Sequence, residues 1–273
     1  MSLLQMFSYP FIQRALIAGV LVSLCAALLG VPLVLKRYSM IGDGLSHVSF
    51  GALAVAVALG FTPLYFSIPV VVAAAFLLLR VADSPRWNSD AAIAVVSASS
   101  LALGVLVISR TSGMTTDVDN YMIGSVLAMS KTDVALSVVL CAAVLVLFIL
   151  FYHRIFAVTF DESFSRATGL NVERYNALLA ILTALTIVLG MRMMGAMLIS
   201  SLVIFPALTA MRVFRSFRGV TLCAAVTSVV CFCAGLTVSF ACSTPVGATV
   251  VAANLIMFLL ACGLAAFRAR TRG

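Results

Sequence analysis

The chain has 273 residues, of which 63% are apolar and only 10% are charged, and its mean hydropathy is +1.21. Soluble domains contain roughly 45–50% apolar and about 25% charged residues, so the composition excludes a water-soluble globular protein. The formal net charge of +8 does not call for nucleic acid as a partner, because basic residues gathered on one membrane face produce the same excess.

Apolar runs long enough to cross a membrane follow one another along most of the chain. A transmembrane helix needs roughly 20 predominantly apolar residues. The tight joint at Arg192 is either a hairpin or a kink, so the number of spans is eight or nine. The sequence therefore predicts an all-α, polytopic membrane protein in which residues 1–273 form a single transmembrane domain. The candidate spans cover residues 11–35, 40–60, 63–80, 91–109, 133–152, 176–191, 193–211, 219–240 and 246–267.

The basic residues between these spans predict the orientation, because cytoplasmic loops of membrane proteins carry an excess of Lys and Arg. With the N-terminus outside, the outer side holds four basic residues, Arg14, Arg110, Lys131 and Arg192. The other thirteen gather on the opposite side, which we expect to be cytoplasmic together with the C-terminus. These are Lys36, Arg37, Arg80, Arg86, Arg154, Arg166, Arg174, Arg212, Arg215, Arg218, Arg268, Arg270 and Arg272.

Three acidic residues then fall on the predicted outer side. Asp117, Asp119 and Asp133 flank a short apolar piece, residues 121–129, that is too short to span a bilayer. An acidic rim at this place would concentrate cations before they enter. An ordinary solvated loop explains the same residues, and both interpretations remain open.

Asp43 is the exception among the acidic residues, since almost all the others lie between spans, and His47 follows it at i+4. On a helix this spacing places the two side chains on one face. A charged carboxylate in hydrocarbon costs roughly 2.5–3.5 kcal/mol on insertion scales, so it needs a partner or a cavity. The pair is either a structural Asp–His hydrogen bond or a site for zinc, manganese or ferrous iron, which accept these ligand types.

Two ligands are too few for tetrahedral zinc, which takes four. The other histidine of the chain, His153, lies at a loop boundary, and no second cluster of ligand residues occurs inside a span. A two-fold homodimer with the second helix near its axis would bring two Asp43 and two His47 side chains together. This hypothesis predicts about one metal ion per dimer.

The long polar segment 153–174 contains a second informative pattern. Phe160, Phe164 and Ala167 recur at i, i+4 and i+7, which predicts a short amphipathic helix, and Gly169 is well placed to end it. Exposed phenylalanines between spans favour insertion into a groove on a partner protein. A helix lying flat on the membrane surface is the alternative.

The sequence offers no catalytic machinery. It contains no G-x-x-x-x-G-K-[ST] loop, and neither of its two lysines, Lys36 and Lys131, has that context. Its serines, histidines and acids show no triad-like grouping. ATP hydrolysis or any other enzymatic activity within this chain is therefore not expected.

Four segments together resemble one family, the integral-membrane permeases of zinc/manganese-type metal-uptake ABC transporters. The resemblance implies a homodimeric or pseudo-dimeric permease in a bacterial-type cell (inner) membrane, cytoplasmic ATP-binding subunits, and an extracytoplasmic metal-binding protein that delivers the ion. The segments are Lys36-Arg-Tyr-Ser-Met-Ile-Gly-Asp-Gly-Leu-Ser-His47, Phe160-Asp-Glu-Ser-Phe-Ser-Arg-Ala-Thr-Gly-Leu170, residues 194–210 and residues 244–249.

The resemblance also assigns roles to residues. Asp43 and His47 match the family's D-x-x-x-H, which is thought to hold the metal in transit. The segment with Phe160, Asp161, Phe164 and Gly169 is similar to the family's ATPase-docking helix. We therefore expect an importer subunit without a permanently bound cofactor that carries zinc, or alternatively manganese or iron.

Two other classes are less consistent with the sequence. An ion-coupled secondary metal transporter normally carries several carboxylates within its spans, whereas this chain offers one. A multi-pass membrane enzyme needs a clustered catalytic set.

Overall fold

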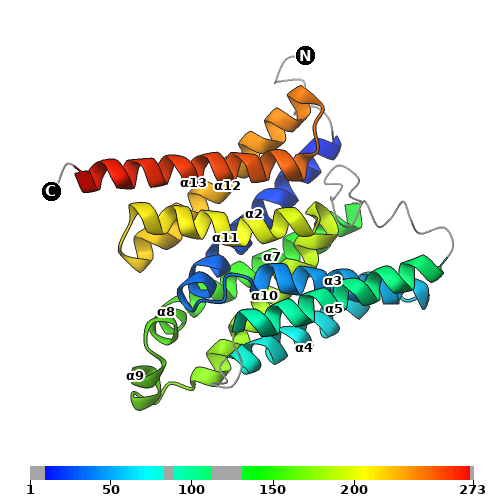
Figure 1. Ribbon diagram of the computed structural model, residues 1–273, viewed down its shortest axis with the longest axis horizontal. Helices are drawn as coiled ribbons and strands as arrows, with labels where there is room; N and C mark the ends of the chain where they lie inside the picture. The colour runs from blue at the N-terminus through cyan, green and yellow to red at the C-terminus, as the bar shows by residue number, and fades with distance from the viewer. Residues whose placement is uncertain (1–9, 83–88, 112–130, 271–273) are drawn as a thin grey trace.

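The computed structural model describes residues 10–82, 89–111 and 131–270, and the regular structure within these ranges is entirely helical (Figure 1). This confirms the predicted all-α class. The helices are α2 (Pro10–Leu35), α3 (Ile41–Ala58), α4 (Pro63–Ala82), α5 (Ser89–Arg110), α7 (Lys131–Leu150), α8 (Tyr152–Phe160), α9 (Glu162–Ala167), α10 (Val172–Met194), α11 (Ala196–Val213), α12 (Phe217–Cys242) and α13 (Val246–Arg270).

Eight of the described helices are long and apolar enough to cross a membrane on their own. A ninth crossing is made if α7 and α8, which are bent by 67° at Phe151, count as one broken span. The prediction of eight or nine spans is thus confirmed, and helix bounds such as Ile41–Ala58 lie close to the predicted ones.

The joint predicted at Arg192 is a hairpin, and its turn lies three residues further on. Gly195, with φ of +86°, separates α10 from α11. An L side chain rarely adopts this backbone conformation, so glycine permits the tight reversal. The two helices contact each other next to this turn, since a Cβ atom added at Gly190 would lie 2.4 Å from Cδ1 of Ile199.

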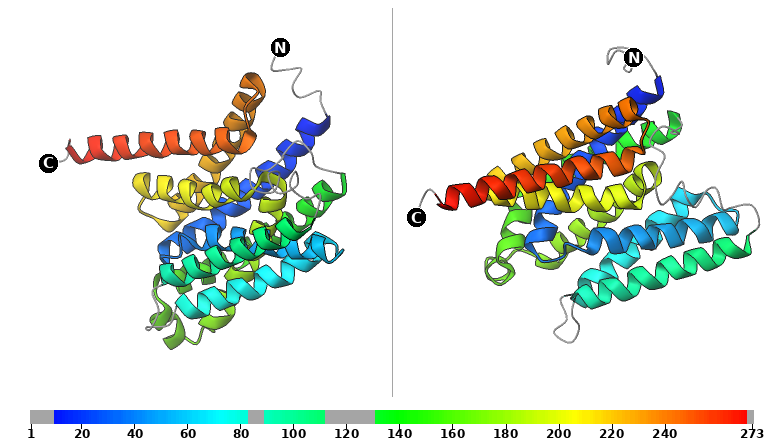
Figure 2. Two further views of the ribbon diagram at one scale, coloured as in Figure 1. Left: turned by 45° about the vertical axis from the view of Figure 1, so that its right-hand side comes forward. Right: turned by 45° about the horizontal axis from the view of Figure 1, so that its top comes forward.

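Helix α2 lies at the centre of the bundle, against α7, α10, α11 and α12, while α3 packs on α4, α5 and α11 (Figure 2). Glycine permits the closest approach between α2 and α11, since a Cβ at Gly30 would lie 2.0 Å from the carbonyl oxygen of Val203. Small residues at helix crossings are the usual means by which membrane helices pack tightly. Val203 also meets α3, because a Cβ atom added at Gly42 would lie 3.5 Å from the Val203 side chain, so one residue of α11 contacts both α2 and α3.

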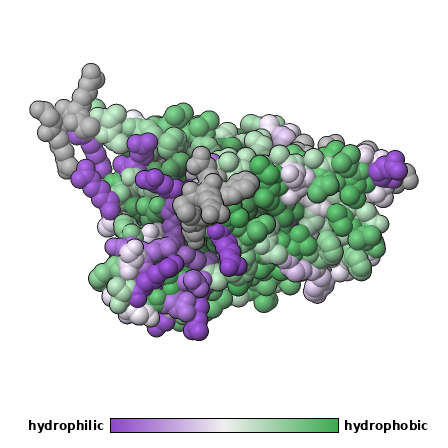
Figure 3. All heavy atoms as spheres, turned by 60° about the horizontal axis from the view of Figure 1, so that its bottom comes forward, coloured by the Kyte–Doolittle hydropathy of each residue, from purple (hydrophilic) through white to green (hydrophobic). Residues whose placement is uncertain are grey.

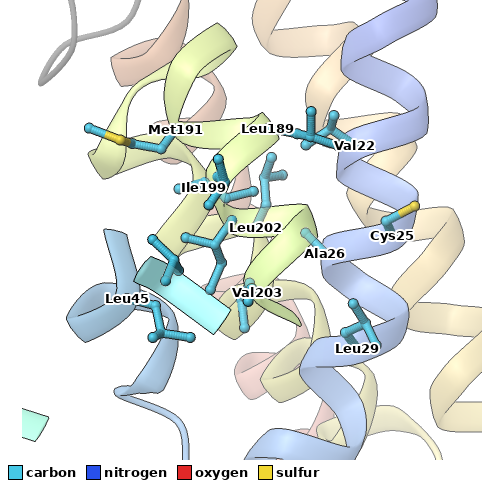
Figure 4. Packing of buried hydrophobic residues seen from close by; sticks show 14 of the residues in the cluster. Val22, Cys25, Ala26, Leu29, Leu45, Leu189, Met191, Ile199, Leu202 and Val203 are labelled. Carbon is cyan, nitrogen blue, oxygen red and sulfur yellow. The ribbon is translucent and has the colours of Figure 1, made fainter. Parts of the chain in front are cut away.

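The core lies where α2 meets the α10–α11 hairpin and α3 (Figure 4). The members labelled in Figure 4 are fully or almost fully buried aliphatic and sulfur-containing side chains from these four helices, and other members of the same core come from α4, α5, α7, α8, α12 and α13. Those labelled are Val22, Cys25, Ala26, Leu29, Leu45, Leu189, Met191, Ile199, Leu202 and Val203.

Large apolar side chains also cover much of the outer surface, particularly on α4, α5 and α13, where Leu77, Leu103 and Leu260 are exposed. Hydrophilic side chains gather toward one end of the face drawn in Figure 3, and most of the rest of that face is apolar. A surface of this kind fits a bilayer around the apolar part, with the polar end in water.

The predicted acidic rim of Asp117, Asp119 and Asp133, and the short apolar piece at 121–129, lie outside the side chains that the structure describes.

Candidate functional site

The predicted pair lies at the beginning of α3, with Asp43 in its first turn and His47 one turn further on. The Nε2 atom of His47 is 3.6 Å from Oδ2 of Asp43, so the i, i+4 spacing brings the two groups together as expected. A helix N-terminus favours a carboxylate, because its unpaired N–H groups carry partial positive charge. Both side chains are partly open, with 41% of Asp43 and 21% of His47 exposed, so an ion has access to them.

Ser200 on α11 is a third polar group at this site, and the sequence analysis did not single it out. Its hydroxyl donates to the Ala196 carbonyl at 2.9 Å and lies 3.4 Å from Oδ1 of Asp43. Ser46, in contrast, donates to the backbone carbonyl of Asp43 and not to its carboxylate. The Ser200-Ser201 pair inside an apolar run was the available signal, but only the packing of α11 on α3 shows which serine faces the carboxylate.

The site holds too few ligands in one chain for a complete metal centre. Among the described residues, no group of three or more His, Cys, Asp and Glu side chains could hold an ion. The two ligand atoms of Asp43 and His47, with the Ser200 hydroxyl beside them, are consistent with a transient site or with one completed from outside the chain.

The predicted docking segment is not one helix but two, and the expectation of a single helix carrying Phe160, Phe164 and Ala167 is wrong. Asp161 has extended backbone angles (φ −149°, ψ 99°) and divides α8 from α9. The carboxylate of Asp161 accepts a hydrogen bond from the Phe164 amide at 2.9 Å and so caps α9. This local capping bond competes with continuation of the helix.

Two other expectations for this segment, exposed phenylalanines and a helix end at Gly169, agree with the structure. Phe160 and Phe164 are 59% and 65% exposed, and Gly169, with φ of +82°, follows the end of α9. The Leu170 amide donates to the Ser165 carbonyl, which closes the helix as glycine-terminated helices commonly do.

Phe160 and Phe164 have different surroundings, however. The ring of Phe160 packs against Phe156 at 4.9 Å and against Phe217 of α12 at 6.0 Å between centroids. Phe164, on the other side of the Asp161 break, has no such ring contact among the described residues. Phe164 is therefore the more available of the two for a partner.

A polar bridge anchors α9 to the bundle. The Nζ atom of Lys36, which is only 7% exposed, lies 2.6 Å from Oε1 of Glu162 and 2.6 Å from Oδ1 of Asn176. Asn176 also donates to Glu162 at 3.2 Å. Burial opposes ionisation of Glu162, but the hydrogen bonds from Lys36 and Asn176 and the charges of Lys36 and Arg166 outweigh it and hold the Glu162 pKa below its usual value.

This bridge connects three parts of the chain that the sequence analysis treated separately. Lys36 follows the last residue of α2, Glu162 opens α9, and Asn176 lies in the first turns of α10. The turn after Lys36 is held by the Tyr38 amide, which donates to the Leu33 carbonyl, and it leads into α3. The docking segment is thus joined through Lys36 to the chain that carries Asp43.

Residues 8–265 match the model of the ABC 3 transport family. The chain belongs to this family. It is 30% identical, over 92% of its length and 97% of the relative's, to a protein of Haemophilus influenzae named high-affinity zinc uptake system membrane protein ZnuB. It is 28% identical, over 94% of its length and 88% of the relative's, to the manganese transport system membrane protein MntC of Halalkalibacterium halodurans.

Solved structures agree with this assignment. The structure described as PsaBC from Streptococcus pneumoniae in complex with Fab superposes with a TM-score of 0.84 at 28% identity, covering 94% of this chain and 92% of the other. A second, described as an inward-facing putative metal-chelate type ABC transporter, has a TM-score of 0.72 at 15% identity and supports the fold alone. The predicted resemblance is confirmed, and the chain is a multi-pass transport permease subunit rather than an enzyme.

Proposed function

We propose that this chain is the membrane-spanning subunit of an ABC importer that carries a divalent transition-metal ion, and that Asp43 and His47 bind the ion in transit. The observation that carries the proposal is the partly open carboxylate–imidazole pair, 3.6 Å apart, at the start of the apolar span Ile41–Ala58. Ionisable side chains of this kind are costly within a membrane, so those that occur there usually have a function.

Zinc is the ion that we propose first, with manganese and iron as alternatives. Imidazole suits zinc, and carboxylate oxygen suits manganese. A site with one ligand of each type therefore discriminates only weakly between the two metals. The names of the relatives divide in the same way, since one belongs to a zinc system and another to a manganese system.

A homodimer with α3 near its two-fold axis would complete the site. Each chain brings one carboxylate and one imidazole, and two chains bring the four ligands of tetrahedral zinc. The exposed fraction of Asp43 is consistent with a ligand that faces outward from its own chain. The Ser200 hydroxyl would then orient the carboxylate from behind.

The partners follow from the family, which implies ATP-binding subunits and an extracytoplasmic binding protein. We propose that Phe160, Asp161, Phe164 and Gly169 form the docking surface for the ATP-binding subunit. Phe164 would anchor it, and Asp161 and Gly169 would fix the two ends of α9. This places α9 in the cytoplasm, the N-terminus outside and the C-terminus inside, in agreement with the distribution of basic residues.

The Lys36–Glu162–Asn176 bridge offers a route for coupling. Movement of α9 by a bound ATPase would be transmitted to Lys36 and through the following turn to the start of α3, where Asp43 lies. The route is short and runs through hydrogen bonds and backbone rather than through the apolar core.

Metal uptake by cells or vesicles that contain the chain with its ATP-binding and metal-binding partners tests the proposal. We expect ATP-dependent zinc uptake that excess manganese reduces less than excess zinc. Uptake that persists without ATP and follows a proton or sodium gradient would instead identify a secondary transporter.

A further inference from the structure

A groove separate from the metal pair opens beside the docking segment, between α4 and α10. It has a cavity volume of about 690 Å³. Ala73, Phe76, Leu77 and Arg80, at i, i+3, i+4 and i+7, line it from one face of α4, together with Leu79. Glu173, Asn176 and Ala177 line it from α10, and Arg166 of α9 reaches it from outside the bundle.

The groove changes from charged to apolar along α4. Arg80 stands at the last turn of the apolar span Pro63–Val81, and Arg166 lies on α9, outside the spans. Phe76 and Leu77, which are exposed, follow one turn deeper, and Ala73 lies roughly 10 Å from Arg80 at 1.5 Å of rise per residue. The charged end is therefore at the membrane boundary, and the apolar end faces the hydrocarbon.

The two arginines give the charged end a net positive charge. Neither Arg80 nor Arg166 is in an ion pair within the described part of the chain. Among the described residues that line the groove, Glu173 is the one acidic residue. Glu162, which is hydrogen-bonded to the lining residue Asn176, also feels the charge of Arg166, but its ion-pair partner is Lys36. Two guanidinium groups against one unpaired carboxylate favour an anion at this end.

We propose that this groove is a binding site for an anionic phospholipid. Arg80 and Arg166 hold its headgroup phosphate, and an acyl chain lies along Phe76, Leu77 and Ala73. The charge complementarity selects an anionic headgroup, and the apolar wall facing the hydrocarbon selects a lipid over a soluble phosphate. Because Asn176 both lines the groove and accepts from Lys36, a lipid here also contacts the bridge that holds α9.

Native mass spectrometry of the full-length chain in mild detergent tests this site with added dioleoyl phosphatidylglycerol, dioleoyl phosphatidylcholine or glycerol phosphate. We expect one phosphatidylglycerol to bind at least about fivefold more tightly than phosphatidylcholine, since one arginine near a membrane surface contributes on the order of that factor. Glycerol phosphate, which lacks acyl chains, should not displace it.

Substitutions in the groove distinguish the contribution of the arginine charges to lipid binding from that of the shape of the groove. Arg80→Gln and Arg166→Gln should each weaken phosphatidylglycerol binding about fivefold, and Arg80→Lys should retain most of it. Arg215→Gln is the matched control, because Arg215 is also exposed but lies in the α11–α12 connection and away from the groove. Ala73→Trp, which fills the groove without changing charge, should abolish the preference for phosphatidylglycerol.

Three results would overturn the proposal. Equal losses in Arg80→Gln and Arg215→Gln would mean that general surface charge binds the lipid. Displacement by glycerol phosphate would make the site one for soluble phosphate. Loss of the ATP-binding subunit from Arg80→Gln, with phosphatidylglycerol binding unchanged, would assign the groove to a protein partner.

Discussion

Lys36 and Glu162 are 126 positions apart in the chain, yet Nζ of Lys36 lies 2.6 Å from Oε1 of Glu162. The ion pair ties the end of α2 to the first residue of α9, and Asn176 joins it from α10. The position of α9, whose buried residue is Ser165, therefore depends on a few polar atoms rather than on a large apolar contact.

Removing the Glu162 carboxylate should loosen α9. Glu162→Gln leaves the nearly buried Lys36 without its counter-ion, and we expect a loss of about 1 kcal/mol, because a partly exposed pair is screened by solvent. Thermal unfolding in detergent measures this loss. Glu173→Gln is the control, because Glu173 is exposed in the first turn of α10 and is in no ion pair within the described ranges. It should lose less stability than Glu162→Gln, since it removes only the interaction of a solvated carboxylate with the helix N-terminus.

The effect of Glu162 should depend on pH in a defined direction. Its pKa in the folded chain is below the usual 4.5, so its stabilising contribution is fully present above about pH 4.5 and is lost as the pH falls through the folded-state pKa. The difference in unfolding temperature between wild type and Glu162→Gln should accordingly be constant from pH 6 to 7, because the carboxylate stays ionised over this range. The same difference should become smaller as the carboxylate is protonated in acid. A difference that grows on acidification would contradict this assignment.

His47→Ala should abolish metal uptake while leaving protein abundance and dimerisation near normal, because it removes half of the ligands that each chain supplies. His153→Ala is the matched control, since His153 is exposed on α8 and far from the pair in sequence. Losing a ligand should lower the affinity for the metal severalfold or more. Uptake by His47→Ala within about twofold of wild type would therefore mean that Asp43 and His47 have only a structural role.

Ser200→Ala should reduce metal affinity less than the ligand substitutions do. The Ser200 hydroxyl donates mainly to the Ala196 carbonyl at 2.9 Å and reaches the Asp43 carboxylate at 3.4 Å, so we expect a loss near the lower end of the roughly 0.5–1.5 kcal/mol of a hydrogen bond, which is about twofold in affinity. The neighbouring Ser201→Ala is the control, because the Ser201 hydroxyl donates to the Leu198 carbonyl. Uptake at several metal concentrations gives both apparent affinities, and equal values for the two variants would count against a role for Ser200.

Phe164→Ala should weaken association with the ATP-binding subunit and uncouple ATP hydrolysis from transport. An anchor residue at an interface often contributes 2 kcal/mol or more, which is about thirtyfold in affinity. Co-purification and ATPase activity stimulated by the metal-binding protein measure the two effects. Phe61, a similarly exposed phenylalanine between α3 and α4, provides the control, and Phe61→Ala should change neither effect. Wild-type behaviour of Phe164→Ala would exclude the docking role.

Linked heterodimers test whether two chains share one metal site. Asp43→Ala and His47→Ala placed together in one protomer, or one in each protomer, both leave two ligands of a shared site, so both should lose metal binding to a similar extent. Independent sites differ, because the first arrangement keeps one complete pair and the second keeps none. Retention of about half the metal in the first arrangement alone would rule out the shared site.

Features that depend on local spacing could be predicted from the sequence. The length of each apolar run reflects the thickness of a bilayer, and the i, i+4 spacing of Asp43 and His47 holds for any α-helix. The exposure of Phe164 and the role of Gly169 after α9 also follow from residues a few positions apart. The break between α8 and α9 at Asp161 also depends on neighbouring residues, since Asp161 caps α9 through the Phe164 amide. The preference of Asp for the N-cap position could therefore have predicted a break within the helix that the spacing of Phe160 and Phe164 suggested.

Only the tertiary structure determined the contacts between distant segments. Ser200 meets Asp43 across 157 positions, and Lys36 meets Asn176 across 140. In a soluble protein, an apolar stripe shows which face of a helix is buried, but lipid is as apolar as a protein core, so a membrane helix is apolar on every side. Composition therefore determined that these helices span a membrane. Their order of packing depended on close-fitting surfaces such as Gly30 against Val203, and this packing in turn placed the third polar group beside Asp43 and His47, the anchor of α9 and the groove at Arg80.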